Sequence, residues 1–257
     1  MPYLETTPDA HPAYREEKKN RIAGFAKDAE FRALSNAWRT MALEKKYMNN
    51  FSWLGRPMIQ LPMDAMALQE IIWAVKPDLI IETGVAHGGS LVLSASILEL
   101  LGHGEVVGVD IEIRAHNRQA IESHPLSRRI SLIEGSSIAA DVIAQVRARA
   151  AGKAKVLVCF DSNHTHEHVL AELNAYADLV SVGSYCVVFD THVEDMPDDY
   201  VWTDRPWGKG NNPKTAVREW IKAHPEFEID RSVEDRLLIT SAPDGFLRRT
   251  QALPRGK

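Results

Sequence analysis

Two aspartates each follow an apolar run, and a histidine stands close to the first of them. Asp161 ends "VLVCFD" and Asp190 ends "YCVVFD", two runs typical of buried strands. Because the carboxyl ends of parallel strands meet at one edge of a sheet, we expect these carboxylates to be neighbours. Neighbouring like charges repel each other unless a cation or a proton lies between them, and oxygen ligands suit a hard divalent cation such as Mg²⁺. The pair predicts a metal site formed by Asp161 and Asp190. The alternative is that Asp161 caps the helix that follows it.

His164 lies three residues after Asp161, at the mouth of the same expected site. An imidazole with an ordinary pKa of about 6.5 can remove a proton from a hydroxyl that a cation has acidified. We therefore predict that Asp161 and His164 are catalytic, with His164 as the general base. The run "HTHEH" (164–168) also allows a zinc site, but on a helix His166 points away from the face that His164 and His168 share. We expect His166 and His168 to be solvated.

Several glycines follow the apolar run in "LIIETGVAHGGS" (79–90), with Glu82 at the junction. The segment lacks the Gly-Lys-Ser/Thr ending of a P-loop. It also departs from the dinucleotide fingerprint, because Ala86 occupies the second glycine position counted from Gly84. The remaining acid-x-Gly-x-Ala-x-Gly pattern, Glu82 to Gly88, resembles the first motif of S-adenosylmethionine-dependent methyltransferases, in which the chain turns tightly under the methionine part of the cofactor. A tight turn that binds no ligand is the alternative.

Two further strand ends carry polar residues suited to a nucleoside. Asp110 ends "VVGVD", and a carboxylate at this place can accept hydrogen bonds from both hydroxyls of a ribose. "LIEGSS" (132–137) ends the next strand with Ser136 and Ser137, which can line an adenine pocket. Because NAD-binding sheets share the ribose-binding acid, these residues indicate an adenosine without selecting one cofactor.

The elements that must position these residues follow from the apolar pattern. Strand-like runs alternate with helical patterns between residues 77 and 191, which is typical of a parallel α/β sheet covered by helices on both faces. "FEIDRSV" and "DRLLITSAPDGFLRR" are expected to add a late strand pair at the edge. We predict a doubly wound, mostly parallel, seven-stranded sheet. Residues 51–64 are expected to be a connection, and Asp64 can cap the helix in "MDAMALQEIIWAVK".

The first 52 residues differ from the rest of the chain. Residues 1–12 are expected to be a loose arm, and residues 13–50 favour helix, with apolar residues spaced for one face. We predict two parts, an N-terminal arm with a helical extension (1–52) and an α/β catalytic domain (53–257). The apolar face predicts a homo-oligomer, or else it packs on its own domain. The residues spaced for this face are Ile22, Phe25, Phe31, Leu34 and Trp38, and those expected at an association surface are Phe25, Phe31, Trp38 and Met41.

Composition excludes several classes of protein. The chain has 257 residues, of which 45% are hydrophobic, so it can bury a large core. A net charge of −5 argues against non-specific nucleic-acid binding. Cys159 and Cys186 lie inside apolar runs and are expected to be buried thiols in a reducing compartment. Neither a signal peptide nor an apolar stretch of about 18 residues is visible. We expect a cytoplasmic protein without a membrane span or a nucleic-acid partner.

Taken in order, the motifs resemble those of the cephalosporin hydroxylase-like methyltransferases, which include rhamnosyl, macrolide-sugar and lipopolysaccharide-type O-methyltransferases. The matching segments run from "WLGRPMIQLPMD" through "PDLIIETGVAHGGS", "VVGVDIEIRAHN" and "FDSNHTHEHVLAEL" to "PWGKGNNPKTAVREW" and "DGFLRR". The resemblance implies a Rossmann-like class I methyltransferase fold, S-adenosylmethionine as cofactor, Mg²⁺, and His164 as base. It implies cofactor contacts at Glu82, Gly84, Ser90, Asp110 and Ser137, to which the motifs above add Gly88 and Ser136.

One position departs from that family's pattern. Many relatives carry an acidic pair at the end of the fifth strand, and here Phe189 replaces the first acid. One expected carboxylate ligand is therefore missing. Water, Thr191 or His192 would have to take its place, or metal affinity is reduced.

The combined prediction is an S-adenosylmethionine-dependent, Mg²⁺-assisted O-methyltransferase. Its substrate would be a sugar hydroxyl of a glycan, a nucleotide-sugar or a glycosylated metabolite, as in polysaccharide or lipopolysaccharide biosynthesis. Residues 194–212 are expected to form a substrate lid in which Trp202 and Trp207 stack on a sugar, or a surface loop whose tryptophans fill the core. The alternatives are a nicotinamide-dependent oxidoreductase and a non-catalytic cofactor-binding relative.

Overall fold

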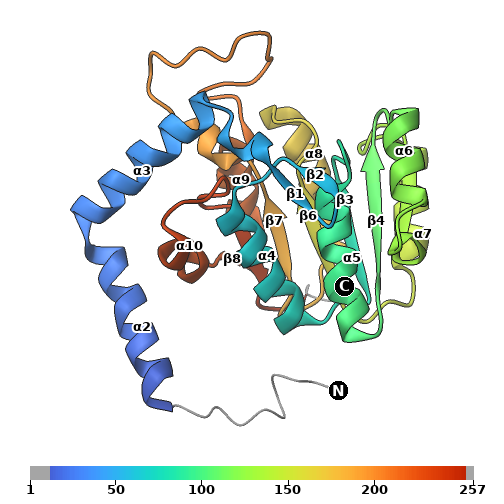
Figure 1. Ribbon diagram of the computed structural model, residues 1–257, viewed down its shortest axis with the longest axis horizontal. Coiled ribbons are helices and arrows are strands. Elements are labelled where there is room, and N and C mark those ends of the chain that lie inside the picture. Colours follow the sequence, from blue (N-terminus) through green and yellow to red (C-terminus); the bar gives the residue numbers. More distant parts are fainter. Residues whose placement is uncertain (1–11, 253–257) are drawn as a thin grey trace.

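The computed structural model describes residues 12–252, and its centre is one seven-stranded sheet (Figure 1). The strand order is β5-β4-β3-β6-β7-β9-β8. The first five of these strands pair in parallel, whereas β9 is antiparallel to both β7 and β8. The predicted doubly wound, mostly parallel sheet is confirmed. The strands are β3 (Leu79–Thr83), β4 (Glu105–Asp110), β5 (Ile130–Glu134), β6 (Val156–Phe160), β7 (Tyr185–Val188), β8 (Phe227–Ile229) and β9 (Phe246–Arg249).

Helices cover both faces of the sheet because alternate strand residues point to opposite sides. In β3, Ile80 packs into one apolar cluster while Leu79 and Ile81 pack into the other. The first cluster includes residues from α4, α5, α6 and α10, and the second includes residues from α7, α8 and α9. The covering helices are α4 (Pro62–Val75), α5 (Gly89–Leu101), α6 (Ala115–Glu122), α7 (Ala140–Ala150), α8 (His166–Tyr176), α9 (Pro213–Trp220) and α10 (Arg231–Leu237).

Both cysteines lie in the centre of this sheet. Cys159 on β6 and Cys186 on β7 are buried free thiols, as the sequence predicts. Burial raises the pKa of each thiol above its ordinary value. Neither thiol is therefore in a position to react at the surface of the folded chain.

Two segments differ from the sequence prediction. The expected late strand pair is interrupted by α10, so only β8 and the short β9 are extended. The connection expected at 51–64 contains a hairpin of β1 (Phe51–Trp53) and β2 (Arg56–Met58). Asp64 does not cap α4: it lies inside the first turn, and its carboxylate accepts hydrogen bonds from Ser241 N and Ser241 Oγ at 2.8 and 2.7 Å, and from Thr240.

The N-terminal residues are helical, as predicted, but form two helices, α2 (Pro12–Lys27) and α3 (Ala29–Glu44). Asp28 separates them and caps α3 by accepting a hydrogen bond from Phe31 N at 2.9 Å. Figure 1 shows both helices running outside the sheet's helical layers. The expected apolar face is largely uncovered, since Leu34 is 63% exposed and Phe31 is 42% exposed. The arm predicted at 1–12 lies outside the described residues except for Pro12.

Between residues 12 and 252, the helices are all too short or too polar to cross a bilayer.

Candidate active site

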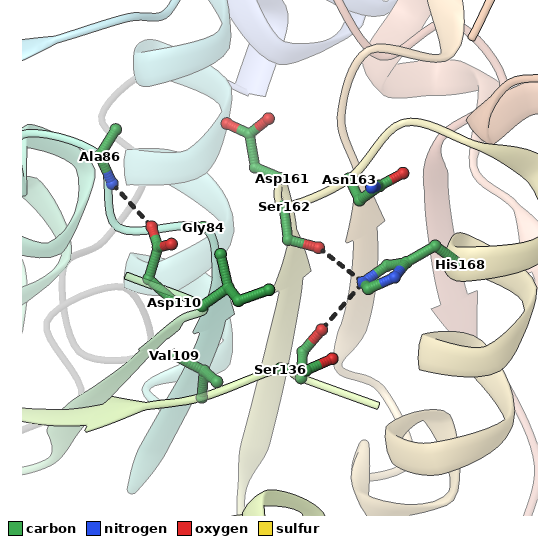
Figure 2. A pocket seen from close by; sticks show the side chains of 11 residues that line it. Gly84, Ala86, Val109, Asp110, Ser136, Asp161, Ser162, Asn163 and His168 are labelled. Atoms are coloured by element: carbon green, nitrogen blue, oxygen red, sulfur yellow. Dashed lines mark hydrogen bonds between the residues drawn. The ribbon is translucent and has the colours of Figure 1, made fainter. Parts of the chain in front are cut away.

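A cavity of about 240 Å³ opens at the carboxyl ends of the strands, where the winding direction reverses between β3 and β6. Open α/β sheets bind ligands at such a switch point. Figure 2 shows Asp110 and His168 on opposite sides of the cavity, with Asp161 between them at the end of its strand. Five predicted site residues meet here, which are Gly84, Asp110, Ser136, Ser137 and Asp161.

The glycines after β3 allow close packing between parts of the chain. A Cβ on Gly84 would lie 2.0 Å from the carbonyl oxygen of Asp161, and φ at Gly84 is +91°. A Cβ on Gly88 would lie 2.5 Å from the side chain of Ile121 on α6, so Gly88 contacts a neighbouring helix and not the cavity. Only glycine fits either position. The tight turn is therefore required by the fold itself, and its Gly84 end also forms the wall of the cavity.

Asp110 holds this turn in place. Its Oδ2 accepts hydrogen bonds from Val85 N at 2.8 Å and Ala86 N at 3.2 Å, and its Oδ1 accepts one from Glu112 N at 3.2 Å. The carboxylate still lines the cavity. A carboxylate can accept further hydrogen bonds besides these three, and the expected ribose contact stays a prediction.

A buried polar network forms the far wall, and one sequence prediction was wrong here. Ser137 and Ser162 donate hydrogen bonds to Glu172 Oε1 at 2.6 and 2.7 Å, and His168 Nε2 lies 3.0 Å from Ser137 Oγ. Glu172 is fully buried. His168 is not solvated, because it lines the cavity within this network. The four-residue spacing of His168 and Glu172 places both on one helix face and was the signal available in the sequence.

Glu82 and Ser90 lie beside the cavity and contact each other. The Ser90 hydroxyl donates a hydrogen bond to Glu82. Burial raises the pKa of Glu82 to about 8, against the opposing effect of that hydrogen bond. Ser90, but not Glu82, lines a second, smaller cavity that shares Gly84, Ala86 and Asp161 with the first.

The two strand-end aspartates and His164 meet, as predicted. His164 Nε2 lies 3.5 Å from Asp161 Oδ1, and His164 Nδ1 lies 3.2 Å from Asp190 Oδ2. One ligand atom from each of the three residues falls within 4.8 Å of the others, a spacing that one metal ion could bridge. Asp190 has a left-handed backbone, with φ +55°, at the turn after β7. The chain accepts this unfavourable conformation while presenting the Asp190 carboxylate to the cluster.

The charges in this cluster are strongly perturbed. Burial and the neighbouring Asp190 raise the pKa of Asp161 to about 7, although the hydrogen bond with His164 opposes this change. Burial alone would lower the pKa of His164, but Asp190 and Asp161 outweigh burial and raise it. Helix α8 begins after Thr165 without a side-chain cap, so Asp161 is not its capping residue. Two desolvated carboxylates with a histidine between them are a donor set that a divalent cation fits.

Phe189, which stands where many relatives have an acid, takes no part in this cluster. Its side chain is 4% exposed and packs in the apolar core. Thr191 Oγ1 donates to Pro243 O at 2.6 Å, and His192 Nδ1 lies 3.5 Å from Asp190 Oδ1 and 3.1 Å from Ser241 O. His192 Nε2 is buried without a partner among the described residues. Of the candidates to replace the missing carboxylate, His192 is therefore the one that touches the cluster.

The histidines of "HTHEH" point to three different places. His164 faces the aspartates, and His168 faces the large cavity. His166 contacts Thr215 Oγ1 at 2.8 Å and Glu219 at 3.2 Å. The rejected zinc site is therefore not formed by these residues, and His166, expected to be solvated, is instead held against α9.

The loop before α9 lies against the cluster. The ring of Trp207 is 4.7 Å from that of His164, between centroids, and Trp202 is 6.2 Å from His192. Arg205 lies 5.1 Å from the Trp207 ring. Both tryptophans are half-buried, so they do not fill the core. Figure 1 shows the loop rising above the strand ends.

Comparisons with known proteins agree on one family. A family model described as rhamnosyl O-methyltransferase/CmcI matches residues 45–250. The rhamnosyl O-methyltransferase of Mycobacterium tuberculosis strain H37Rv is 31% identical over 216 residues, covering 80% of this chain and 82% of that protein. The Mycobacterium leprae protein of the same name is 29% identical over 215 residues, with 80% and 88% covered. A solved structure of CmcI with Mg and SAM has a TM-score of 0.55 at 20% identity, covering 79% of this chain and 78% of that one.

Proposed function

The chain belongs to the rhamnosyl O-methyltransferase/CmcI family, and on that premise we propose that it methylates a sugar hydroxyl, with S-adenosylmethionine as donor and Mg²⁺ beside the acceptor. One observation carries the proposal. Asp161 belongs both to the wall of the large cavity and to the cluster with His164 and Asp190. A donor in the cavity and an acceptor at the cluster would therefore meet at Asp161.

We assign the large cavity to the cofactor's nucleoside. Asp110 would accept hydrogen bonds from the ribose, while Ser136, Ser137 and His168 would surround the adenine. Gly84 and Ser90 would line the path of the methionine part, and Gly88 and Glu82, which line neither cavity, would shape it from outside. S-adenosylmethionine supplies a methyl group already activated by a positively charged sulfur. The protein's task is then mainly to align an oxygen with that methyl group.

We assign the cation to Asp161 and Asp190, with His192 supporting Asp190. A divalent cation would offset the repulsion between the two carboxylates and lower the pKa of a bound hydroxyl. His164 is within reach of both carboxylates and is the group that would accept the hydroxyl proton. After transfer, the charge on His164 would be stabilised by the same two aspartates.

We assign the acceptor to the space between the cluster and the loop that carries Trp202 and Trp207. Flat indole rings bind the apolar face of a sugar, and Trp207 already lies against His164. The curated relatives are named for a rhamnosyl acceptor. A deoxysugar of a polysaccharide or lipopolysaccharide precursor, made in the cytoplasm, fits the proposal.

A methyl-transfer assay tests this function. The protein is incubated with S-adenosylmethionine and a panel of rhamnosides and nucleotide-sugars, and products are identified by mass. We expect methylation that is lost with EDTA and restored by Mg²⁺, and strongly reduced in Asp190→Asn. Cofactor binding without transfer to any sugar would instead support the non-catalytic alternative, which Phe189 motivates. The nicotinamide-dependent alternative conflicts with the family assignment.

We also propose that the chain forms a homo-oligomer through the exposed apolar face of α3. This face consists of Phe31, Leu34, Trp38 and Met41, each of which is exposed. A stripe of this kind on a helix outside the main layers favours contact with another protein surface.

A further inference from the structure

We infer that Gln60 binds the amino-acid end of S-adenosylmethionine, in the smaller cavity beside the nucleoside pocket. This inference rests on the proposed function. The smaller cavity measures about 40 Å³ and is lined by Gln60, Ser90, Gly89 and Gly84 among other residues. About 10–15 Å³ is enough to hold one water molecule, so this space accommodates a small polar group.

Gln60 has an unsatisfied oxygen. The residue is 4% exposed, and its Oε1 is enclosed without a hydrogen-bond partner among residues 12–252. Buried polar atoms nearly always have a partner, because leaving one unpaired costs free energy. A buried acceptor that borders a cavity is therefore suited to a donor that arrives with a ligand. An ammonium group is such a donor.

Gln60 and the start of α5 line the same small cavity. A Cβ on Gly89 would lie 2.3 Å from Pro57 O, which shows how closely the β1–β2 hairpin packs on this helix end. No side chain caps the N-terminus of α5. Its first N–H groups and the helix dipole favour a carboxylate. The two charged groups of an amino acid would thus find different partners, the carboxylate at α5 and the ammonium at Gln60.

The position of the smaller cavity, next to the nucleoside pocket, agrees with its assignment to the amino-acid end of the cofactor. It shares Gly84, Ala86 and Asp161 with the nucleoside pocket, so one ligand can occupy both. Ser90 lines the smaller cavity and donates a hydrogen bond to Glu82, so a carboxyl group lies next to the ammonium side. The cofactor would then be fixed at both ends, with its methyl group facing Asp161.

Calorimetry with two ligands tests the inference. S-adenosylhomocysteine has the amino-acid end, whereas 5′-methylthioadenosine lacks it. We expect Gln60→Leu to weaken S-adenosylhomocysteine binding about ten- to a hundred-fold and to leave 5′-methylthioadenosine binding unchanged. Gln60→Glu, which keeps an acceptor, should bind S-adenosylhomocysteine much more tightly than Gln60→Leu. Asp110→Asn is the control at the nucleoside end of the cofactor and should weaken the binding of both ligands.

The outcomes separate the two proposals. Equal losses for both ligands in Gln60→Leu, or unchanged binding of S-adenosylhomocysteine, would overturn the role of Gln60. If the wild-type protein binds neither ligand, the proposed function itself fails. Thermal melting checks that each variant folds, and should Gln60→Leu not fold, Gln60→Met makes the same comparison at nearly constant side-chain length.

Discussion

At the scale of single residues, three carboxyl groups whose pKa values are raised differ in how many hydrogen-bond donors compensate them. Asp64 accepts three hydrogen bonds from Thr240 and Ser241, and burial raises its pKa only to about 6. Glu82 has one donor, and its pKa rises to about 8. Asp161 has only His164, and its pKa rises to about 7. The poorly compensated groups are the ones beside the cavities, as is common where a ligand completes a site.

The raised pKa of Glu82 makes the stability of the ligand-free protein depend on pH. The folded state keeps this proton up to about pH 8, whereas the unfolded chain releases it near the ordinary pKa of 4.5. Stability should therefore fall as pH rises between these values, by at most about 1.4 kcal/mol per pH unit from this group. Glu82→Gln should lose most of that slope and be more stable than the wild type near pH 8. Urea unfolding at several pH values between these limits measures the free energy of unfolding of both proteins. An equal dependence on pH in the wild type and in Glu82→Gln would contradict the raised pKa of Glu82.

His164 is expected to accept the proton of the sugar hydroxyl and to contribute nothing to cofactor binding. His164→Ala should lower kcat about 10²- to 10⁴-fold. The variant should bind S-adenosylhomocysteine with the same affinity as the wild type, since His164 does not line either cofactor cavity. Added imidazole should restore part of the rate. A variant that loses cofactor affinity and rate together would show that His164 has a structural role.

The sequence predicted that Asp161, Asp190 and His164 would lie together, because strand ends determine where these residues lie. Asp161, Asp190 and His164 meet since β6 and β7 are parallel neighbours. The wall formed by His168 and Glu172 and the unpaired oxygen of Gln60 depend on side-chain burial between distant segments. The four-residue spacing of His168 and Glu172 was visible in the sequence, but no pattern within one segment reports such burial, so the roles of these residues emerged only from the structure.

At the scale of elements, the loop between η4 (Thr191–Asp195) and α9 lies against the cluster. It is anchored at its base, where Glu194 accepts hydrogen bonds from Gly210 N at 2.8 Å and from the side chain of Asn212. Asn212 also caps α9. The anchored ends and the indole rings between them fit the expected role of this loop as a substrate lid.

We expect Trp207→Ala to raise KM for the sugar acceptor by roughly tenfold, because it removes a stacking surface. Binding of S-adenosylhomocysteine should change little, since Trp207 lines neither cofactor cavity. Steady-state kinetics with varied acceptor, together with calorimetry, separates the two effects. Thr203→Ala, at an exposed position of the same loop, is the control and should behave as the wild type.

The elements that the sequence mispredicted are short and depend on tertiary contacts. Val233, Leu237, Leu238 and Ile239 give the segment before β9 a strand-like composition. The chain nevertheless forms α10, because Asp230 caps it and Val233 is buried against the core. Long apolar runs such as β3 and β6, buried throughout, were predictable from composition alone.

At the scale of the whole molecule, α3 presents two adjacent stripes. Ser35, Arg39 and Ala42 are buried, and Arg39 reaches Asp195 at 3.6 Å near the base of the lid. The neighbouring apolar stripe, Phe31 to Met41, faces outward. One side of the helix thus belongs to the catalytic body while the other is available to a second copy.

Charges introduced into the outward stripe should separate the subunits. Leu34→Glu combined with Met41→Glu should shift the protein to a monomer in light scattering, because a buried carboxylate disfavours an apolar interface. Asn36→Glu is exposed on the opposite side of α3 and should leave the mass unchanged. A wild-type protein that is already monomeric would refute the proposed assembly.

The location of the two cysteines makes the lid easy to observe. Cys159 and Cys186 are the chain's only thiols, and both are enclosed within the sheet. A cysteine introduced at an exposed lid position, such as Asp204, would then be the single site open to a maleimide dye. Opening and closing over an acceptor could be followed by fluorescence in a protein whose native thiols need no replacement.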